Sequence, residues 1–406
     1  MLIYETMKLV YIANARLPTE KAHGYQICKM CEAFADNGVD VQLFHPYRYE
    51  SDPDLKRKNV FKYYRISPVF QTRTLPNWDV LLLERLLPGK IFIPFFFMHS
   101  LLWGLYAAWI SRSKKADIYY TREITIAFWL ILLGLPTVYE SHVVPQRGQR
   151  WLLYRIAKHP KLQRVVVLTS FIRDQFVEMG FPNEKLIVLP DSVDLSLFEA
   201  LPAKEECRLR LGLPKDRPIV GYIGRFRTMD MEKGIPELVQ AMSHIPSNDN
   251  VEPLLLCVGG PMDAVPSYLE LAKRYGLPKQ RIQFVDRVPN SEVPLWIRAC
   301  DVVTIPWPWN EFSAYFTSPM KLFEYMASGV PIVATDLPAI KEILRHGENA
   351  WLVKPGNSSA LAEGIKEVLS QLHIAKKISE QARGDVKNYT WRARALTILK
   401  ASNLQK

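Results

Sequence analysis

The sequence predicts an α/β protein with two domains, each a doubly wound parallel β-sheet covered by helices. Apolar runs of four to six residues alternate with helix-length amphipathic segments along the chain, which is typical of βαβ units. The alternation is interrupted in the proline-containing, mixed-charge stretch 201–217. The length of 406 residues also exceeds the roughly 250–300 residues at which single cores stop growing. We therefore expect one domain over residues 1–200 and another over 201–388.

Short apolar runs define the expected strands in both halves. In the first half they are 8–13, 39–44, 117–120, 136–140, 164–168 and 185–189. In the second half they are 219–224, 254–258, 282–285, 302–305, 332–334 and 350–353. A last helix is expected over 389–404, with an apolar side formed by Trp391, Ala395, Ile398 and Leu399. It follows the final strand, so we expect residues 389–406 to pack back on the first domain.

The composition excludes several classes of protein. With 48% hydrophobic residues, 23% charged residues and 19 glycines, the chain is neither disordered nor collagen-like. Its net charge of +11 divides almost evenly, as +6 in residues 1–200 and +5 in 201–406. The even division favours anionic small molecules or an acidic membrane over nucleic acid as partners. Within the first domain the excess is concentrated near residues 56–65 and 147–164.

The cysteines and the amino terminus indicate a cytoplasmic protein. Five scattered cysteines do not make a disulfide framework. Cys28 and Cys31 form a CxxC, but they share a helical face with Ile27 and Phe34, which favours small core residues over a redox pair. The amino terminus lacks the pattern of a secretory signal, and residues 1–6 are expected to be a short leader.

Two segments of the first domain raise the question of membrane contact. Residues 91–110 carry no formal charge and are long enough to span a bilayer, but Pro94, His99 and Gly104 interrupt them. A buried or half-buried helix is favoured, and a membrane-surface helix or a true span is the alternative. The basic, aromatic stretch 56–65 is expected either to lie on acidic headgroups or to form a solvated surface hairpin.

The first candidate site is the glycine-rich, basic segment 221–234. Arg225 and Lys233 would bring two positive charges to the carboxyl end of a strand, where glycines allow close backbone approach. A diphosphate is the natural partner for such a site. The alternative is a solvated loop in which both cations pair with Asp230 and Glu232.

The second candidate site is the helix expected after Thr317. Ser318 suits the N-cap, Pro319 the first helical position and Gly329 the stop. A helix that begins there points free N–H groups at the carboxyl ends of the strands, which creates an anion site. Glu324 would accept hydrogen bonds from a ribose diol. The alternative for Glu324 is an i,i+3 ion pair with Lys321.

These segments together resemble the retaining glycosyltransferases of family 4, which have the GT-B fold. The resemblance rests on Gly224-Arg225 with Lys233-Gly234, on the run 318–331 and on the run 189–198, in which Asp191-Ser192 replaces the family's asparagine-glycine. It covers nearly the whole chain and is weakest over 46–115. It implies two Rossmann-like domains that face a central cleft, with the acceptor bound by the first domain and the donor by the second.

The resemblance also implies residue roles. Arg225 and Lys233 would hold the donor diphosphate, and Glu324 would hold the donor ribose. His142 would face the sugar and the acceptor as a catalytic residue. Gly24 would let the loop after the first strand touch the ligand. Further donor contacts would come from Ser318, Pro319, Lys321, Gly224 and Val288.

The chain departs from the family at two positions. The family's first acid, eight positions before Glu324, is replaced by Phe316, which leaves the donor sugar open; Glu311 is a possible substitute. The family's paired glycines occur only as His23-Gly24.

The expected activity is transfer of a hexose from a nucleoside diphosphate sugar, with retention and without a cofactor. No Asp-x-Asp follows a strand at the expected place, so we expect no metal requirement. The acceptor would be a cell-surface glycan, a lipid-linked sugar or a small molecule, and the protein would be cytoplasmic, with possible peripheral contact with an acidic membrane. The alternatives are a nucleotide-sugar epimerase and a non-catalytic membrane-surface protein with a degenerate sugar site.

Overall fold

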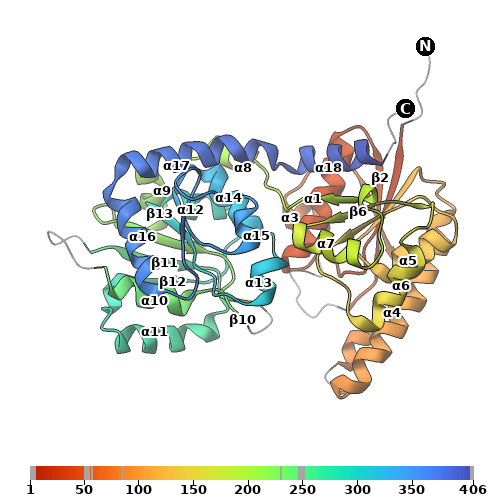
Figure 1. Cartoon of the computed structure of the whole chain (residues 1–406), viewed down its shortest axis with the longest axis horizontal. Helices are drawn as coiled ribbons and strands as arrows, with labels where there is room; N and C mark the ends of the chain where they lie inside the picture. The colour runs from red at the N-terminus through yellow and green to blue at the C-terminus, as the bar shows by residue number, and fades with distance from the viewer. Residues whose placement is uncertain are drawn as a thin grey trace, which may run out of the picture. The chain divides into compact units, whose positions relative to one another are not determined.

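The chain folds into two compact units. The computed structural model describes residues 6–49, 55, 58–84, 86–228, 231–245 and 252–402. The first unit comprises Met1–Pro190 and Trp391–Lys406, and the second comprises Asp191–Thr390. The chain thus leaves the first unit at Pro190, whereas the composition placed the boundary at residue 200, and it returns at Trp391 (Figure 1).

The first unit contains a seven-stranded parallel sheet in the order β3-β2-β1-β4-β5-β6-β7. Its strands are β1 (Lys8–Ile12), β2 (Asp40–Pro46), β3 (Gln71–Leu75), β4 (Ile118–Thr121), β5 (Thr137–Ser141), β6 (Leu162–Val167) and β7 (Leu186–Val188). Its helices are α1 (Ala22–Asp36), α3 (Val60–Tyr64), α4 (Gly89–Arg112), α5 (Ile124–Leu132), α6 (Arg150–Ile156), α7 (Ser170–Glu178) and α18 (Trp391–Ala401). The strand order reverses direction between β1 and β4, where doubly wound sheets bind ligands at the carboxyl edge.

The second unit contains a six-stranded parallel sheet in the order β12-β11-β8-β13-β14-β15. Its strands are β8 (Ile219–Ile223), β11 (Leu254–Val258), β12 (Ile282–Val285), β13 (Val302–Ile305), β14 (Ile332–Thr335) and β15 (Trp351–Val353), and a separate hairpin pairs β9 (Arg227–Thr228) with β10 (Met231–Glu232). Its helices are α8 (Ser196–Glu199), α9 (Lys204–Leu211), α10 (Ile235–Ser243), α11 (Val265–Arg274), α12 (Val293–Arg298), α13 (Glu311–Tyr315), α14 (Met320–Ser328), α15 (Pro338–Lys341), α16 (Ser358–Ser370) and α17 (Leu372–Asp385). Here the order reverses between β8 and β13.

Both faces of the second sheet are buried, as continuous apolar strands require. Ile219 and Ile223 of β8 point into one core with Leu256. Val220 and Tyr222, the residues between them, point into the other core. The alternation confirms that these short apolar runs are central strands of a parallel sheet.

Two features of the first unit differ from the sequence expectations. Strand β3 was not expected, because its side chains before Leu75 are polar and exposed; it lies at the sheet edge and pairs only with β2.

The expectation of a surface hairpin over 56–65 is wrong for the described part of that stretch. Asn59 accepts a hydrogen bond from Lys62 N and caps the short helix α3, while Lys56 and Arg57 lie outside the described residues.

Helix α4 occupies the uncharged segment 91–110 and is half-buried. Trp103 and Ala107 join a core cluster of the first unit, and Trp103 Nε1 donates to the Pro76 carbonyl at 3.3 Å. Gly104 lets α4 pack closely on α5, since a Cβ there would lie 3.2 Å from the Thr125 carbonyl oxygen. By length and composition α4 could cross a membrane, and 33% of its apolar window is buried inside the protein through contacts such as these. The helix is therefore an integral part of the first unit.

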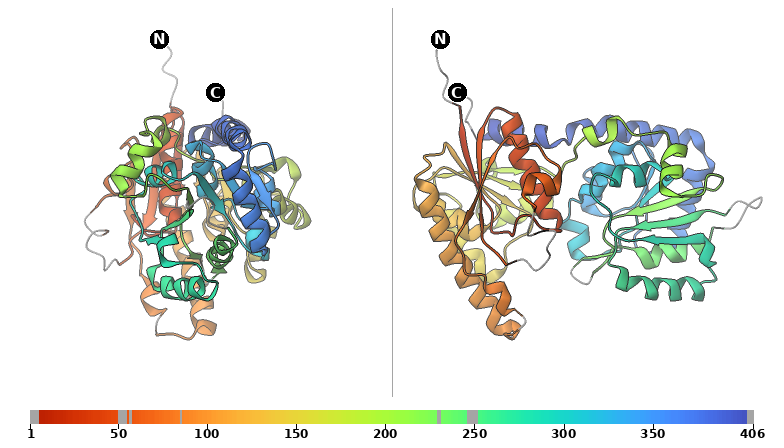
Figure 2. Two further views of the ribbon diagram at one scale, coloured as in Figure 1. Left: turned by 90° about the vertical axis from the view of Figure 1, so that its left-hand side faces the viewer. Right: turned by 180° about the vertical axis from the view of Figure 1, so that it is seen from behind.

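Helix α18 packs against α1 in the first unit (Figure 2). Trp391, Ala395, Ile398 and Leu399 are buried, as the apolar pattern predicted. On α1, the thiols of Cys28 and Cys31 are free and buried, and burial raises the pKa of both. The two cysteines are therefore core residues.

A buried ion pair fixes α18 to the end of β5. Arg394 Nη1 lies 3.0 Å from Glu140 Oε2, and both side chains are about 4% exposed or less. Arg394 also donates to the carbonyl of Pro190 at 3.0 Å, and Tyr120 donates to Glu140. Burial alone would raise the pKa of Glu140, but Arg394 and the His142 hydrogen bond hold it well below its usual range. The carboxylate is therefore ionised, and each of its two oxygens is hydrogen-bonded.

We expect Arg394→Leu to lower the free energy of unfolding by about 3–5 kcal/mol, because it leaves a buried carboxylate without its main counter-charge. Arg392→Leu, at an exposed position of the same helix, is the control and should change the value by less than about 0.5 kcal/mol. Urea titration followed by tryptophan fluorescence measures both. Equal effects of the two variants would contradict a special role for the ion pair.

Candidate functional site

The candidate site of the second unit lies at the carboxyl edge of its sheet, where the strand order reverses. Gly224 follows β8, Gly259 and Gly260 follow β11, and Trp307 follows β13. All three glycines have positive φ angles, and a Cβ on Gly259 would lie 2.1 Å from the Gly224 carbonyl oxygen. The backbones of two strand ends are thus in direct contact, which only glycine permits here.

Gly224 also makes room for a lysine from α14. A Cβ at Gly224 would lie 2.4 Å from Lys321 Nζ, and the φ of +142° is itself unfavourable for other residues. The ammonium lies 3.8 Å from the centroid of the Tyr222 ring. Lys321 therefore crosses the end of β8 and places its charge against an aromatic face.

Lys233 is a second buried cation at this edge. It follows the β9–β10 hairpin and is 5% exposed. Its Nζ lies 4.3 Å from the Trp307 ring centroid and 5.6 Å from that of Phe312. Burial lowers the pKa of Lys233 to about 8, and no acid among the described residues opposes the shift. A buried ammonium without a counter-charge is costly, so the site is suited to an anion.

The alternative in which Arg225 and Lys233 pair with Glu232 is wrong. Glu232 accepts from Arg227 at 2.5 Å and from the Tyr268 hydroxyl at 2.7 Å. Both of its oxygens are therefore occupied by other residues. Arg225 is exposed and makes no ion pair within the described part of the chain. Asp230, the other acid of that alternative, lies outside the described residues, as does Met229.

Lys321 and Glu324 titrate near neutrality. Burial and, to a smaller degree, the Lys233 charge lower the pKa of Lys321 to about 7, although Glu324 opposes the shift. Burial raises the pKa of Glu324 to about 7 against the effect of Lys321. Lys321 Nζ has no hydrogen-bond partner among the described residues, so the expected alternative of a direct i,i+3 hydrogen-bonded pair is not formed. The Glu324 carboxylate therefore remains available to a ligand.

The start of α14 differs from the expected capping pattern. The helix begins at Met320 with Pro319 as its N-cap, one position later than predicted, and Gly329 ends it with a φ of +70° as expected. Ser318 does not cap the helix; its Oγ accepts from Asp191 N at 2.8 Å. The sequence could not show this, because Asp191 is far away along the chain. The first backbone N–H groups of α14 are left without a side-chain cap.

The remaining expected donor residues follow neighbouring strands. Val288 follows β12 and is half-buried against the same core as Ile223. Phe316 ends α13, and Glu311 is exposed in the first turn of that helix. Gly259 and Gly260 were missed by the sequence reasoning, although a Gly-Gly-Pro run directly after a strand was a usable signal.

In the first unit, His142 lies just past β5 in a network of charged side chains. Its Nε2 lies 2.5 Å from Glu140 Oε1, and its Nδ1 accepts from Arg122 Nη2 at 2.7 Å. Burial and the Arg122 charge lower the pKa of His142 to about 4, although Glu140 opposes them. Both ring nitrogens are engaged, so His142 is a neutral, fixed hydrogen-bonding group and has no free lone pair for a proton.

Gly24 has a packing role that the sequence did not indicate. It lies in the first turn of α1, and a Cβ there would lie 2.1 Å from the Tyr64 hydroxyl. That hydroxyl accepts from Thr19 N and donates to Thr19 O, both at 2.8 Å. The space beside Gly24 is therefore filled by Tyr64, which holds the loop after β1.

Comparison with known proteins shows two family matches in tandem. Residues 24–197 match the family described as Glycosyltransferase Family 4, and residues 217–371 match the family described as Glycosyl transferases group 1. The 2-deoxystreptamine glucosyltransferase of Streptomyces kanamyceticus is 26% identical over 272 residues, which are 66% of this chain and 65% of that protein. The chain spans about half to two-thirds of the length of the curated relatives it matches.

Solved structures show the same fold. A glycosyltransferase from Rickettsia africae has a TM-score of 0.74 at 17% identity, over 98% of each chain. Anabaena HepE in complex with UDP and glucose has a TM-score of 0.68 at 18% identity, over 98% of this chain and 100% of that one. At these identities the likeness shows the fold alone, which is the GT-B fold with its two parallel-sheet α/β domains.

We expect the binding of a diphosphate ligand to take up protons and to weaken as pH rises from 7 to 9. A diphosphate raises the pKa of nearby lysines, so Lys321 and Lys233, with pKa values of about 7 and 8, become fully protonated in the complex. The gain in diphosphate affinity is present at pH values below the two lysine pKa values and is lost at pH values above them. Glu324 ionises over the same pH range. Calorimetry in buffers of different ionisation enthalpy measures the uptake.

The control for this titration is Lys341→Met, since Lys341 is exposed and paired with Asp336 at 2.8 Å. It should leave the proton uptake unchanged, whereas Lys321→Met should reduce it. Uptake that is the same in both variants would show that Lys321 is not part of the site.

Proposed function

Because the chain belongs to the glycosyltransferases described by its two family matches, we propose that it transfers a hexose from a nucleoside diphosphate sugar to an acceptor hydroxyl with retention at the anomeric carbon. One observation carries the proposal. Two lysine ammonium groups, Lys233 and Lys321, are buried at the carboxyl edge of the second sheet, and no acid among the described residues is hydrogen-bonded to either of them. A diphosphate leaving group supplies the charge that they lack.

The proposed donor roles follow from this geometry. Arg225 and Lys233 stabilise the charge that develops on the diphosphate as the glycosidic bond breaks, and Lys321 adds a third cation. The uncapped N–H groups at the start of α14 bind phosphate oxygens. Glu324, one turn further along the helix, accepts hydrogen bonds from the ribose. UDP is the first nucleotide to test, because the solved Anabaena protein is in complex with UDP.

The proposed chemistry is a front-face displacement. The acceptor oxygen bonds to the anomeric carbon on the face that the diphosphate leaves, and the departing phosphate takes the acceptor proton. His142 is assigned to the sugar and acceptor as a fixed, neutral hydrogen-bonding group, since both of its nitrogens are engaged. The lack of an Asp-x-Asp at the expected place after a strand supports a reaction that needs no metal. Unchanged turnover in EDTA is the expected result.

We expect Arg225→Ala and Lys233→Ala each to lower kcat by about 10²–10³-fold, as is typical for a lost transition-state charge contact. Arg274→Ala, on the exposed side of α11, is the matched control and should stay within twofold. The measurement is initial-rate transfer from labelled UDP-hexoses to a panel of acceptors. Unchanged rates in both site variants would overturn the assignment.

The same assays separate the alternatives. An isomerised donor that accumulates without acceptor would indicate an epimerase. No thermal shift with millimolar nucleoside diphosphates would indicate a degenerate sugar site, since a bound ligand at a hundred times its dissociation constant adds about 2.7 kcal/mol of stability.

We expect His142→Ala to lower kcat for transfer by about 10²-fold while the dissociation constant of UDP changes by less than twofold, because the proposed diphosphate ligands all belong to the second unit. In the wild-type protein, the kcat profile should show no ionisation near pH 6.5 that His142→Ala removes, since the pKa of His142 is about 4. Loss of UDP affinity in this variant would contradict its assignment to the acceptor.

A further inference from the structure

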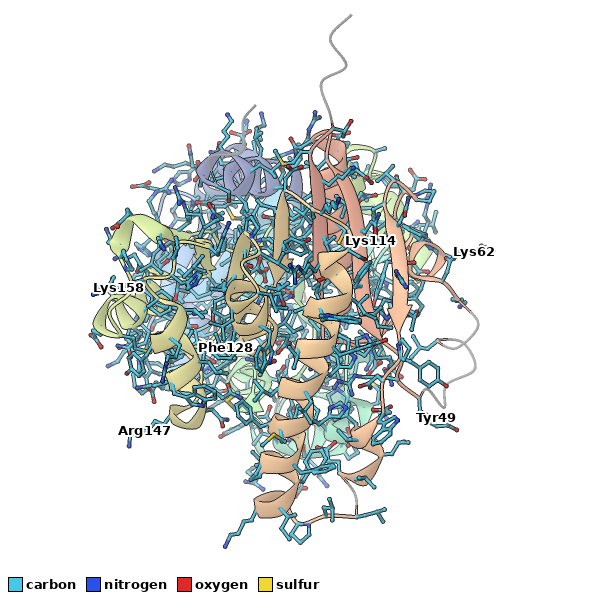
Figure 3. All side chains as sticks on the ribbon, turned by 90° about the vertical axis from the view of Figure 1, so that its right-hand side faces the viewer. Tyr49, Lys62, Lys114, Phe128, Arg147 and Lys158 are labelled. Carbon is cyan, nitrogen blue, oxygen red and sulfur yellow. The ribbon has the colours of Figure 1, made fainter. Side chains whose placement is uncertain are left out.

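We infer that the exposed side chains of α4, α5 and α6 form a surface that docks the protein onto an anionic lipid bilayer. These three helices make one layer of the first unit, seen face-on in Figure 3. Trp129 of α5 donates to the Leu101 carbonyl of α4 at 2.9 Å, and Phe128 of α5 contacts Trp151 of α6 with ring centroids 5.4 Å apart. We call the outward side of this layer the helical face.

The helical face exposes large apolar side chains that nothing within the described chain covers. The amino-terminal part of α4 extends beyond the rest of the first unit in both Figure 1 and Figure 2. Exposed fractions on α4 reach 61% at Ile93, 60% at Leu102 and 64% at Trp109. Further exposed members are Ile91, Phe95, Met98, Leu132, Trp151 and Tyr154. A patch of this kind marks an interaction site.

The charges of the same segment identify the partner. Residues 86–164 contain eleven Lys and Arg against three Asp and Glu, so this fifth of the chain carries most of the net charge of +11. None of the three acids is fully exposed: Glu140 is buried, and Asp117 and Glu123 are half-buried. The fully exposed charges are all basic, and they are Lys90, Arg112, Lys115, Arg147, Arg155 and Lys158.

This combination fits a bilayer better than a protein partner or a span. An exposed surface with charges of one sign repels a second copy of itself but attracts anionic headgroups. Exposed tryptophans and basic side chains around an apolar strip are typical of helices that lie in the membrane interface. A span would require α4 to leave the core that Trp103 and Ala107 share with the sheet. The face therefore lies on the membrane.

The inference is tested by flotation with vesicles of phosphatidylcholine, with and without phosphatidylglycerol. The wild-type chain should bind the anionic vesicles, and high salt should release most of it. Lys115→Gln with Arg155→Gln should weaken binding about tenfold or more, since each cation near the surface contributes about fivefold. Ile93→Ser with Leu102→Ser should weaken binding to a similar degree.

Matched controls lie in the second unit. Lys273→Gln with Lys279→Gln removes two exposed cations, and Trp309→Ser with Leu372→Ser removes two exposed apolar side chains. Both should bind vesicles as the wild type does. Binding without preference for anionic lipid, or equal losses in test and control variants, would overturn the inference. Chain that only detergent releases from native membranes would overturn it in favour of a span, and reversible dimerisation through this face would do so in favour of a second copy.

The docking assay is independent of the proposed transferase activity. UDP binding by each variant is measured in parallel by thermal shift. Variants that lose vesicle binding should keep the UDP shift, because their substitutions lie in the first unit and the proposed diphosphate ligands all belong to the second. A wild-type chain that binds vesicles but not UDP would refute the proposed function and leave this inference standing.

Discussion

The first unit depends on the interactions of the buried Glu140 carboxylate. This carboxylate lies at the end of β5, where it binds Arg394 of the last helix on one oxygen and His142 on the other. Because a buried ion of one sign must be compensated, this single acid fixes α18 on the unit and sets the orientation of the histidine. The end of the chain and the candidate catalytic residue are thereby held by the same group.

The buried charges of the second unit differ from that of Glu140 in how they are compensated. Lys233 and Lys321 lie against aromatic rings, and no acid in the described part of the chain is hydrogen-bonded to them. Burial lowers the pKa of both. Aromatic faces attract a cation without neutralising it. The buried charge of Glu140 is therefore compensated by residues of its own unit, whereas the charges of Lys233 and Lys321 are compensated only when an anion binds. This contrast is the reason why we propose that the second unit binds the donor.

The central strands could be predicted because each is a short apolar run, and burial on both faces leaves such runs little alternative. The edge strand β3 could not, since its exposed side chains give no apolar pattern and its place depends on β2. Ser318 was assigned a local capping role from its neighbours, but its oxygen binds Asp191 N. Likewise, nothing in the sequence indicated that the Tyr64 hydroxyl packs beside Gly24. Each difference came from a partner distant in the sequence.

The sequence by itself determined the fold class, the family and the residue types at the strand ends, because apolar periodicity and short motifs are local properties. Only the tertiary structure decided which charges are compensated. It paired Glu232 with Arg227 and left Arg225 without an ion pair in the described chain. It also brought α4, α5 and α6, with their exposed apolar and basic side chains, together as one helical face. The even division of the net charge into +6 and +5 gave no indication of that face. Electrostatic interactions depend on the distances between charges in space, and the totals along the chain do not contain these distances.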